Sequence, residues 1–268
     1  MMNNSALHNN YPFTLISTYH KPFPFPNNPV VKPVHAGKSL SALDLDIEGD
    51  NIGENISNLN PYFSELTVVY YIWKNYSKLQ MPYWGLCHYR RYFTLHRNWL
   101  KFKSIYHLTS PENAFNKIFT PTLLQTIQSE LEKGKVILPK PYVFIKLKKW
   151  SVKKQFIKDH GAASWICMEK VVEELYPGYV NSMNSVANGL TCSWYNMLIA
   201  DWNFWDRYLT WLFDILFEVK KNLDKSDDKS DLRIYGNLSE RLLNIYIHYW
   251  QRKGQQVFHL PVAHITSV

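Results

Sequence analysis

The chain has 268 residues and carries 30 Lys and Arg against 22 Asp and Glu, which gives a net charge of +8 at pH 7. Its length suits one large α/β domain, and a hydrophobic fraction of 46% is enough to fill a core. The three cysteines are far apart and form no Cys-x-x-Cys pair, so a disulfide framework and a zinc ribbon are excluded and a reducing cytoplasm is expected. No apolar run reaches the roughly 18 residues that would span a membrane, and the N-terminus lacks a signal-peptide core.

The predicted elements begin after a polar leader. We expect residues 1–11 to be disordered and residues 12–268 to form one domain. Five prolines between Pro22 and Pro33 indicate an extended loop, and a second loop at 48–57 is rich in turn residues and carboxylates. Strands are expected at 13–18, 83–88, 135–139, 191–199 and 257–262, and helices at 61–77, 120–133, 161–176, 201–222 and 236–250.

This alternation predicts an α/β fold with a mostly parallel sheet flanked by helices. Asn60-Pro61 is a strong helix start, with Asn60 expected as the cap. The aromatic residues of 201–217 are expected mainly in the core. A lysine-rich segment at 140–158 is expected to be a solvated face, with membrane or acceptor contact as the alternative.

The most informative stretch is residues 83–93, where an apolar run ends in His88, Tyr89, Arg90 and Arg91. In open α/β sheets, ligands bind at the edge where strands end. Two adjacent guanidinium groups at such an edge suit a phosphate or a diphosphate, and the alternative is a pair of surface arginines.

Several familiar sites are excluded by their motifs. The chain has no His-Glu-x-x-His, no Walker loop and no Gly-x-Gly-x-x-Gly. A phosphatase loop would need an arginine six residues after Cys87, and Phe93 stands there. What remains is a set of polar clusters at predicted strand ends, which the topology would bring to one rim of the sheet.

These clusters resemble a family of bacterial capsule and exopolysaccharide glycosyltransferases that has been catalogued as a domain of unknown function. The block His88-Tyr89-Arg90-Arg91-Tyr92 is the distinctive one. The matching stretches are residues 17–22, 49–57, 60–67, 85–93, 194–197 and 236–244, so the resemblance spans nearly the whole chain.

The resemblance implies a GT-A (Rossmann-like) fold, a nucleotide-sugar donor and a growing glycan acceptor. In GT-A enzymes the strand corresponding to 85–87 normally ends in Asp-x-Asp, whose carboxylates hold a divalent metal on the donor diphosphate. Here His88-Tyr89-Arg90 stands in that place. Because fixed cations can also stabilise a diphosphate leaving group, we hypothesise metal-independent transfer with Arg90, Arg91 and His88 on the phosphates.

Further roles follow from the same resemblance. The remaining donor-site candidates are Thr18, His20, Lys21, Asp50, Asn51, Asn55, Glu65, Tyr89 and Asn196. A metal held by Asp50, Glu54 and Glu65, or a purely structural turn, is the alternative for the acidic loop. The catalytic candidates are Glu240 as general base, Arg241 beside it, and His160 as a weaker base. The alternative for Glu240 and Arg241 is a polar group at the start of a helix or an intrahelical ion pair.

We therefore expect a cytoplasmic hexosyltransferase that needs no cofactor. It would move a hexose, with galactose preferred, from a UDP-sugar to a lipid-linked glycan at the inner face of the membrane, which the net charge of +8 allows. The rival class is a non-enzymatic binding module for RNA or another polyanion. Dispersed basic residues and the absence of an RNA-binding motif weigh against nucleic acid as a partner.

Overall fold

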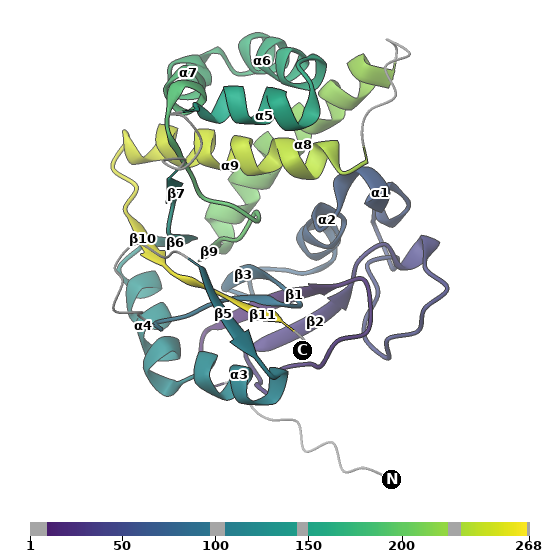
Figure 1. The fold of residues 1–268 in the computed structure, drawn as a ribbon, viewed down its shortest axis with the longest axis vertical. Coiled ribbons are helices and arrows are strands. Elements are labelled where there is room, and N and C mark those ends of the chain that lie inside the picture. Colours follow the sequence, from purple (N-terminus) through teal and green to yellow (C-terminus); the bar gives the residue numbers. More distant parts are fainter. Residues whose placement is uncertain (1–9, 97–104, 144–149, 225–231, 267–268) are drawn as a thin grey trace.

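The computed structural model describes residues 10–96, 105–143, 150–224 and 232–266. Nine strands of the described chain form one sheet, and two helical layers cover its faces (Figure 1). The strands are β1 (Phe13–Tyr19), β2 (Val31–His35), β3 (Tyr83–His88), β4 (Arg91–Phe93), β5 (Ile105–Thr109), β6 (Val136–Pro139), β9 (Ile199–Asp201), β10 (Val257–Leu260) and β11 (Val262–Thr266). A small second sheet pairs β7 (Tyr142–Val143) with β8 (Thr191–Cys192).

The helices of the described chain divide between the two faces. They are α1 (Asn60–Phe63), α2 (Leu66–Asn75), α3 (Pro111–Ile118), α4 (Pro121–Glu132), α5 (Val152–His160), α6 (Ala163–Leu175), α7 (Val180–Asn188), α8 (Trp202–Asp224) and α9 (Ile234–Gln251). Figure 1 shows α5–α9 gathered on one side of the sheet and α3 and α4 on the other. No helix within the described ranges is both long and apolar enough to cross a bilayer.

The expected α/β sheet flanked by helices is confirmed. The parallel pairings, β1–β2, β1–β3, β5–β11 and β6–β10, carry the longer ladders. The antiparallel pairings of β3, β4, β6, β9 and β11 are shorter, and β3 meets β4 only through His88 and Arg91. The central pair β1–β3 positions the site, because Thr18 lies opposite His88 where both strands end.

Alternating side chains of the central strands supply two cores. Ile16 and Leu86 face the core under α2 and α5–α9, whereas Leu15 and Cys87 face the core under α3 and α4. This alternation follows from the two-residue period of a strand.

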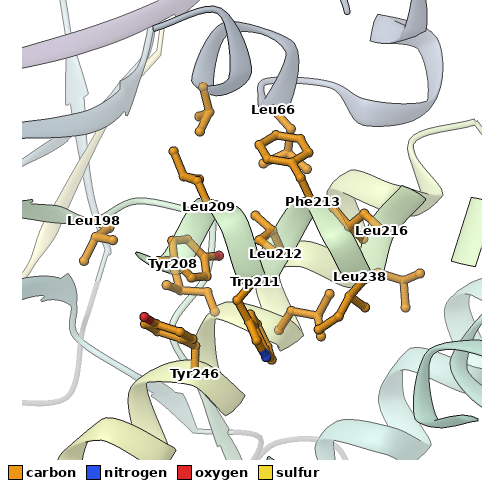
Figure 2. Packing of buried hydrophobic residues seen from close by; sticks show 14 of the residues in the cluster. Leu66, Leu198, Tyr208, Leu209, Trp211, Leu212, Phe213, Leu216, Leu238 and Tyr246 are labelled. Atoms are coloured by element: carbon orange, nitrogen blue, oxygen red, sulfur yellow. The ribbon is translucent and has the colours of Figure 1, made fainter. Parts of the chain in front are cut away.

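The aromatic helix α8 is largely core, as its sequence predicts. Its buried residues pack against α9 and Leu66 of α2 (Figure 2). The Trp205 ring stacks on Trp84 of β3 with centroids 4.0 Å apart, and its Nε1 donates a hydrogen bond of 2.8 Å to the Trp84 carbonyl. These contacts fix the central strand to the helical layer.

Two elements differ from the sequence prediction near the site. The helix expected over 61–77 breaks into α1 and α2, because Ser64 takes a left-handed backbone with φ of 51°. Asn60 lies inside α1 rather than capping it, and its Nδ2 donates to the Ser64 carbonyl at 2.8 Å. The side-chain amide thereby holds the break in place.

The strand expected over 191–199 is also wrong. Residues 191–192 and 199–201 belong to different sheets. Between them, Tyr195 and Asn196 both have positive φ, 75° and 53°. Asn196 therefore lies in a left-handed turn, a conformation that Asn adopts more readily than most residues.

A third difference concerns the proline-rich loop and the charged segments. The loop ends earlier than expected because β2 begins at Val31. Pro33 is tolerated within β2 because this strand pairs with β1 alone among the described strands, so the missing N–H of proline can face away from the sheet. Lys146, Lys148, Lys149, the loop 225–231 and residues 1–9 of the leader lie outside the described residues.

Candidate active site

A cavity of about 490 Å³ opens where β1 and β3 end. Its walls come from the β1 end, the residue after β2, the β3–β4 turn, α1 with its junction to α2, and the residue before α9. The lining residues are Thr18, His20, Lys21, Ala36, Asn60, Pro61, Ser64, Glu65, His88, Tyr89, Arg90, Arg91 and Arg233. Eight predicted donor-site residues thus meet in one cavity: Thr18, His20, Lys21, Glu65, His88, Tyr89, Arg90 and Arg91.

The sheet register explains this convergence. The Tyr89 N–H donates to the Thr18 carbonyl at 3.0 Å, which extends the β1–β3 ladder by one step. A tight turn at Tyr89 and Arg90 then returns the chain into β4, whose first residue is Arg91. Polar residues that follow the two strands are consequently side by side at one edge of the sheet.

The Tyr89 ring organises the basic side chains around it. Its centroid lies 4.9 Å from the Arg90 guanidinium and 5.7 Å from the Lys21 ammonium. The His20 ring meets it edge-on at 5.0 Å. Cation–π contacts hold the two charges without neutralising them, so they remain available to an anion.

His88 is a buried neutral link rather than a cation. Its Nε2 donates a hydrogen bond of 2.7 Å to the Tyr195 carbonyl, and its Nδ1 lies 3.4 Å from the Thr18 hydroxyl. Burial lowers the pKa of His88. Burial, together with Lys21 nearby, also lowers the pKa of His20. The permanent positive charge of the cavity therefore comes from its lysine and arginines.

Four basic residues line the cavity and form no ion pair with any described carboxylate: Lys21, Arg90, Arg91 and Arg233. The Arg91 guanidinium lies 4.6 Å from the Tyr195 ring centroid. The Nε of Arg90 is buried without a hydrogen-bond partner in the described chain. Clustered charges without internal partners are a costly arrangement unless an anionic ligand completes it.

Arg233 is the main lining residue that the sequence did not reveal. Its backbone is left-handed, with φ of 70°, and its N–H donates to the Pro61 carbonyl at 2.8 Å. Its Nε donates to the Ser64 hydroxyl at 3.2 Å, so two left-handed residues support each other. Ser and Arg rarely adopt a left-handed backbone, so the residue types at 64 and 233 do not predict it. Arg233 also comes just after the charged segment 225–231, where one more basic residue does not stand out.

Among the residues that the structure describes, Glu65 is the one carboxylate that lines the cavity. Its Oε1 accepts a 2.7 Å hydrogen bond from Nδ2 of Asn196, which also donates to the Gly236 carbonyl at 3.2 Å. The Ser239 hydroxyl donates to Oδ1 of Asn196 at 2.9 Å. Asn196 itself is buried and does not line the cavity, so it acts as the support that orients Glu65.

Glu240 lies behind that support. Its Oε1 accepts from the Tyr195 N–H at 2.8 Å, and its Oε2 accepts from Nη1 of Arg241 at 2.8 Å. Burial raises the pKa of Glu240 to about 7, with Glu65 contributing in the same direction and Arg241 opposing. Glu240 is thus positioned to hold the left-handed turn, and it does not line the cavity.

Arg241 and His160 also lie outside the cavity lining. The buried Arg241 guanidinium stacks 4.5 Å from the Trp194 ring and donates from Nη2 to Oε1 of Gln155 at 2.8 Å. His160, at the end of α5, has its Nδ1 3.5 Å from Nδ2 of Asn237. Both residues join α9 to α5, which is a packing role.

The acidic loop binds its own backbone instead of the cavity. The Asp50 carboxylate is buried and accepts hydrogen bonds from the Gly37 N–H at 2.8 Å and from the Lys38 N–H at 3.0 Å. The hydroxyls of Ser57 and Thr67 donate to it as well. A side chain so fully engaged fits the structural-turn alternative.

The neighbours of Asp50 are likewise outside the cavity lining. Asn51 is exposed, and Nδ2 of Asn55 donates to the Gly53 carbonyl at 2.9 Å. A metal site does not fit the cavity, because Glu65 is surrounded there by basic side chains rather than by further carboxylates. No group of three or more His, Cys, Asp or Glu side chains in the described ranges could hold a metal ion.

The α/β fold is similar to that of a solved glycosyltransferase structure. The chain is similar to the apo structure of the WbbM bifunctional glycosyltransferase, with 27% sequence identity and a TM-score of 0.82. The similarity covers 95% of this chain and 45% of the WbbM chain, so this chain spans less than half of that protein's length.

The family follows from the sequence. The chain belongs to the family described as a domain of unknown function, DUF4422, which matches residues 14–253. No match is found among curated proteins. The match agrees with the expectation of a family catalogued as a domain of unknown function, and the similarity to WbbM supports a glycosyltransferase-like family. A role in capsule or exopolysaccharide synthesis stays a prediction.

Proposed function

We propose that the protein is a hexosyltransferase that moves a sugar from a nucleoside diphosphate donor to a growing glycan. The observation that carries this proposal is the cavity at the ends of β1 and β3, with four basic residues that form no ion pair with a described carboxylate. A nucleoside diphosphate has the charge that these side chains leave uncompensated. The similarity to a protein named as a glycosyltransferase supports the same reaction class.

In this proposal Arg90, Arg91 and Lys21 bind the donor diphosphate, and Arg233 closes the cavity from the side of α9. Charge builds up on the diphosphate as the bond to the sugar breaks. Side chains already fixed against aromatic rings stabilise that charge with little reorganisation. Transfer would then need no divalent metal, because guanidinium groups occupy the place of metal-binding carboxylates.

Glu65 is the proton acceptor in this mechanism. An acceptor hydroxyl attacks the anomeric carbon, the bond from that carbon to the diphosphate oxygen breaks, and the hydroxyl proton passes to the carboxylate. Asn196 fixes Oε1 of Glu65, which leaves Oε2 for the hydroxyl. Glu240 was the expected base, but its two oxygens are engaged by Tyr195 and Arg241, so we assign it a positioning role.

The donor base and the acceptor follow from the expectations made on the sequence. We propose UDP as the nucleotide, galactose as the preferred hexose and a lipid-linked capsule, exopolysaccharide or O-antigen precursor as the acceptor. The net charge of +8 is compatible with work at the anionic inner face of the membrane.

A donor-hydrolysis screen tests the proposal, because many transferases release donor sugar slowly to water. UDP-galactose, UDP-glucose, UDP-N-acetylglucosamine and GDP-mannose are incubated with the purified protein, and nucleotide release is followed with and without EDTA. We expect one UDP-sugar to be cleaved in EDTA, and the Arg90→Ala protein to cleave it about 10²–10³-fold more slowly. Cleavage of none of them, or equal cleavage by the variant, would contradict the proposal.

A further inference from the structure

A second hollow lies between the proline-rich loop and α3, and we call it the Phe25 hollow. Its lining residues are Phe25, Pro26, Asn27, Asn28, Glu112, Phe115, Asn116 and Phe119. Its volume of about 300 Å³ is at the lower end of the range for small-molecule sites. In Figure 1 α3 lies at the end of the molecule opposite α6 and α7, so this hollow is separate from the helical layer.

The apolar part of the hollow is a set of aromatic rings. Phe25 is 42% exposed, Phe119 is half-buried and Phe115 is buried. Pro24 and Pro26 restrict the backbone of Phe25, and its ring packs edge-on against Tyr19 with centroids 4.8 Å apart, so it has little freedom to lose on binding. A flat ring held in this way suits packing against the apolar C–H face of a pyranose.

The polar part is made of amides and a carboxylate. The side chains of Asn27, Asn116 and Glu112 form no hydrogen bond or ion pair with another described residue. An amide both donates and accepts, and a carboxylate accepts, which matches the mixed donors and acceptors of sugar hydroxyls. None of the described residues that line the hollow is basic, so its chemistry differs from that of the cationic cavity.

One buried ring contacts a lining residue of the hollow and a lining residue of the cavity. The Tyr19 ring has its centroid 4.8 Å from that of Phe25 and 5.9 Å from that of Tyr89. Lys21 lines the cavity and Phe25 follows four residues later, so their Cα atoms are at most about 14 Å apart. A short oligosaccharide can reach from one to the other.

We propose that the Phe25 hollow is a carbohydrate subsite that holds the body of the glycan acceptor while its end enters the cationic cavity. The proposal rests on the function proposed above. It adds a place for the acceptor that the cavity itself does not provide, since the cavity is dominated by groups suited to a diphosphate.

Saturation-transfer NMR with methyl galactopyranoside, methyl glucopyranoside and methyl mannopyranoside tests the subsite directly. We expect transfer from protein to the ring protons of at least one glycoside. Phe25→Ala and Asn116→Ala should weaken that binding by about three- to tenfold. Phe25→Trp should retain it, because the larger ring keeps the stacking surface.

Two matched variants serve as controls. Asn113→Ala changes the same residue type on the same helix at an exposed position outside the hollow, and should bind the glycoside like wild type. Arg90→Ala, in the cavity, should also bind it like wild type. No saturation transfer from any of the three glycosides, or transfer unaffected by Phe25→Ala, would overturn the subsite.

The melting temperature of the same samples with and without UDP separates this proposal from the function. Stabilisation by UDP without glycoside binding would overturn the subsite alone. Glycoside binding at Phe25 without any UDP stabilisation would overturn the donor role of the cavity and leave the subsite standing.

Discussion

Two polar regions adjoin the same edge of the sheet and use their charges in opposite ways. In the acidic loop, the buried Asp50 carboxylate is surrounded by donors from Gly37, Lys38, Ser57 and Thr67. In the cavity, by contrast, Lys21, Arg90 and Arg91 contact aromatic rings, Arg233 donates to the Ser64 hydroxyl, and no described carboxylate pairs with any of the four.

The contrast separates structure from function. A buried polar group whose partners are all internal stabilises the fold, since removing a partner leaves an unpaired group. A cluster of like charges without partners is unfavourable in the free protein and becomes favourable when an anion binds. Asp50 thus shapes the Gly37 turn beside the cavity, and the arginines are left for a ligand.

Arg90→Ala should have the largest effect, and it should affect activity while leaving stability nearly unchanged. Loss of a fixed cation from the developing diphosphate charge should lower the rate of donor cleavage by about 10²–10³-fold. The melting temperature should stay near that of wild type, because Arg90 makes no ion pair within the described chain. Arg252→Ala, an exposed arginine beyond α9, is the matched control and should leave the rate unchanged.

Glu65→Gln tests whether the carboxylate acts chemically. The amide retains an oxygen for Asn196 but accepts no proton, so transfer to an acceptor should slow by about 10²-fold. UDP binding should be retained in the same protein. A matching loss of UDP affinity would instead assign Glu65 to donor binding.

Asp50→Asn should change stability and spare activity. The amide cannot accept from all four donors, and each donor left unpaired should cost about 1–3 kcal/mol of unfolding free energy. Chemical denaturation measures this loss, and the KM for the donor should be unchanged at temperatures where the variant is folded. A raised KM with unchanged stability would place Asp50 in the donor site after all.

Glu240→Gln should have the smallest effect of the four changes. It should be seen as a change in how the stability of the folded protein depends on pH. Because burial raises the pKa of Glu240 to about 7, the folded chain retains a proton that the unfolded chain has already lost. Wild-type stability should therefore fall as pH rises from about 4.5 to about 7, by on the order of 1–3 kcal/mol. Glu240→Gln lacks this slope, so its stability relative to wild type should increase over the same range in thermal melts.

Several helices and strands could be predicted because the sequence patterns that define them involve only neighbouring residues. The cap and proline at Thr120-Pro121 start α4, and the Thr120 hydroxyl accepts from the Leu123 N–H at 3.2 Å. The apolar run at 83–87 became the central strand, and the adjacent His88 to Arg91 fell at its end. Local pattern was sufficient for these elements.

The rest of the site depends on contacts between distant segments. Ser64, Asn196 and Arg233 have left-handed backbones, and Ser64 and Arg233 are joined by a side-chain hydrogen bond. Ser and Arg do not signal this conformation in a sequence, and Asn does so only weakly. Asn196 was placed in a strand and is instead a support in a turn. Asp50 was expected to bind the donor, because a carboxylate-rich loop looks the same in sequence whether its partners are a ligand or its own backbone.

Calorimetric titration of UDP into the protein in the presence of EDTA tests the central claim most directly. The account predicts saturable binding without metal, unchanged by added Mg²⁺ or Mn²⁺, and lost in the Arg90→Ala and Arg91→Ala proteins. Binding that appears only after metal is added, or that both arginine variants retain in full, would contradict it.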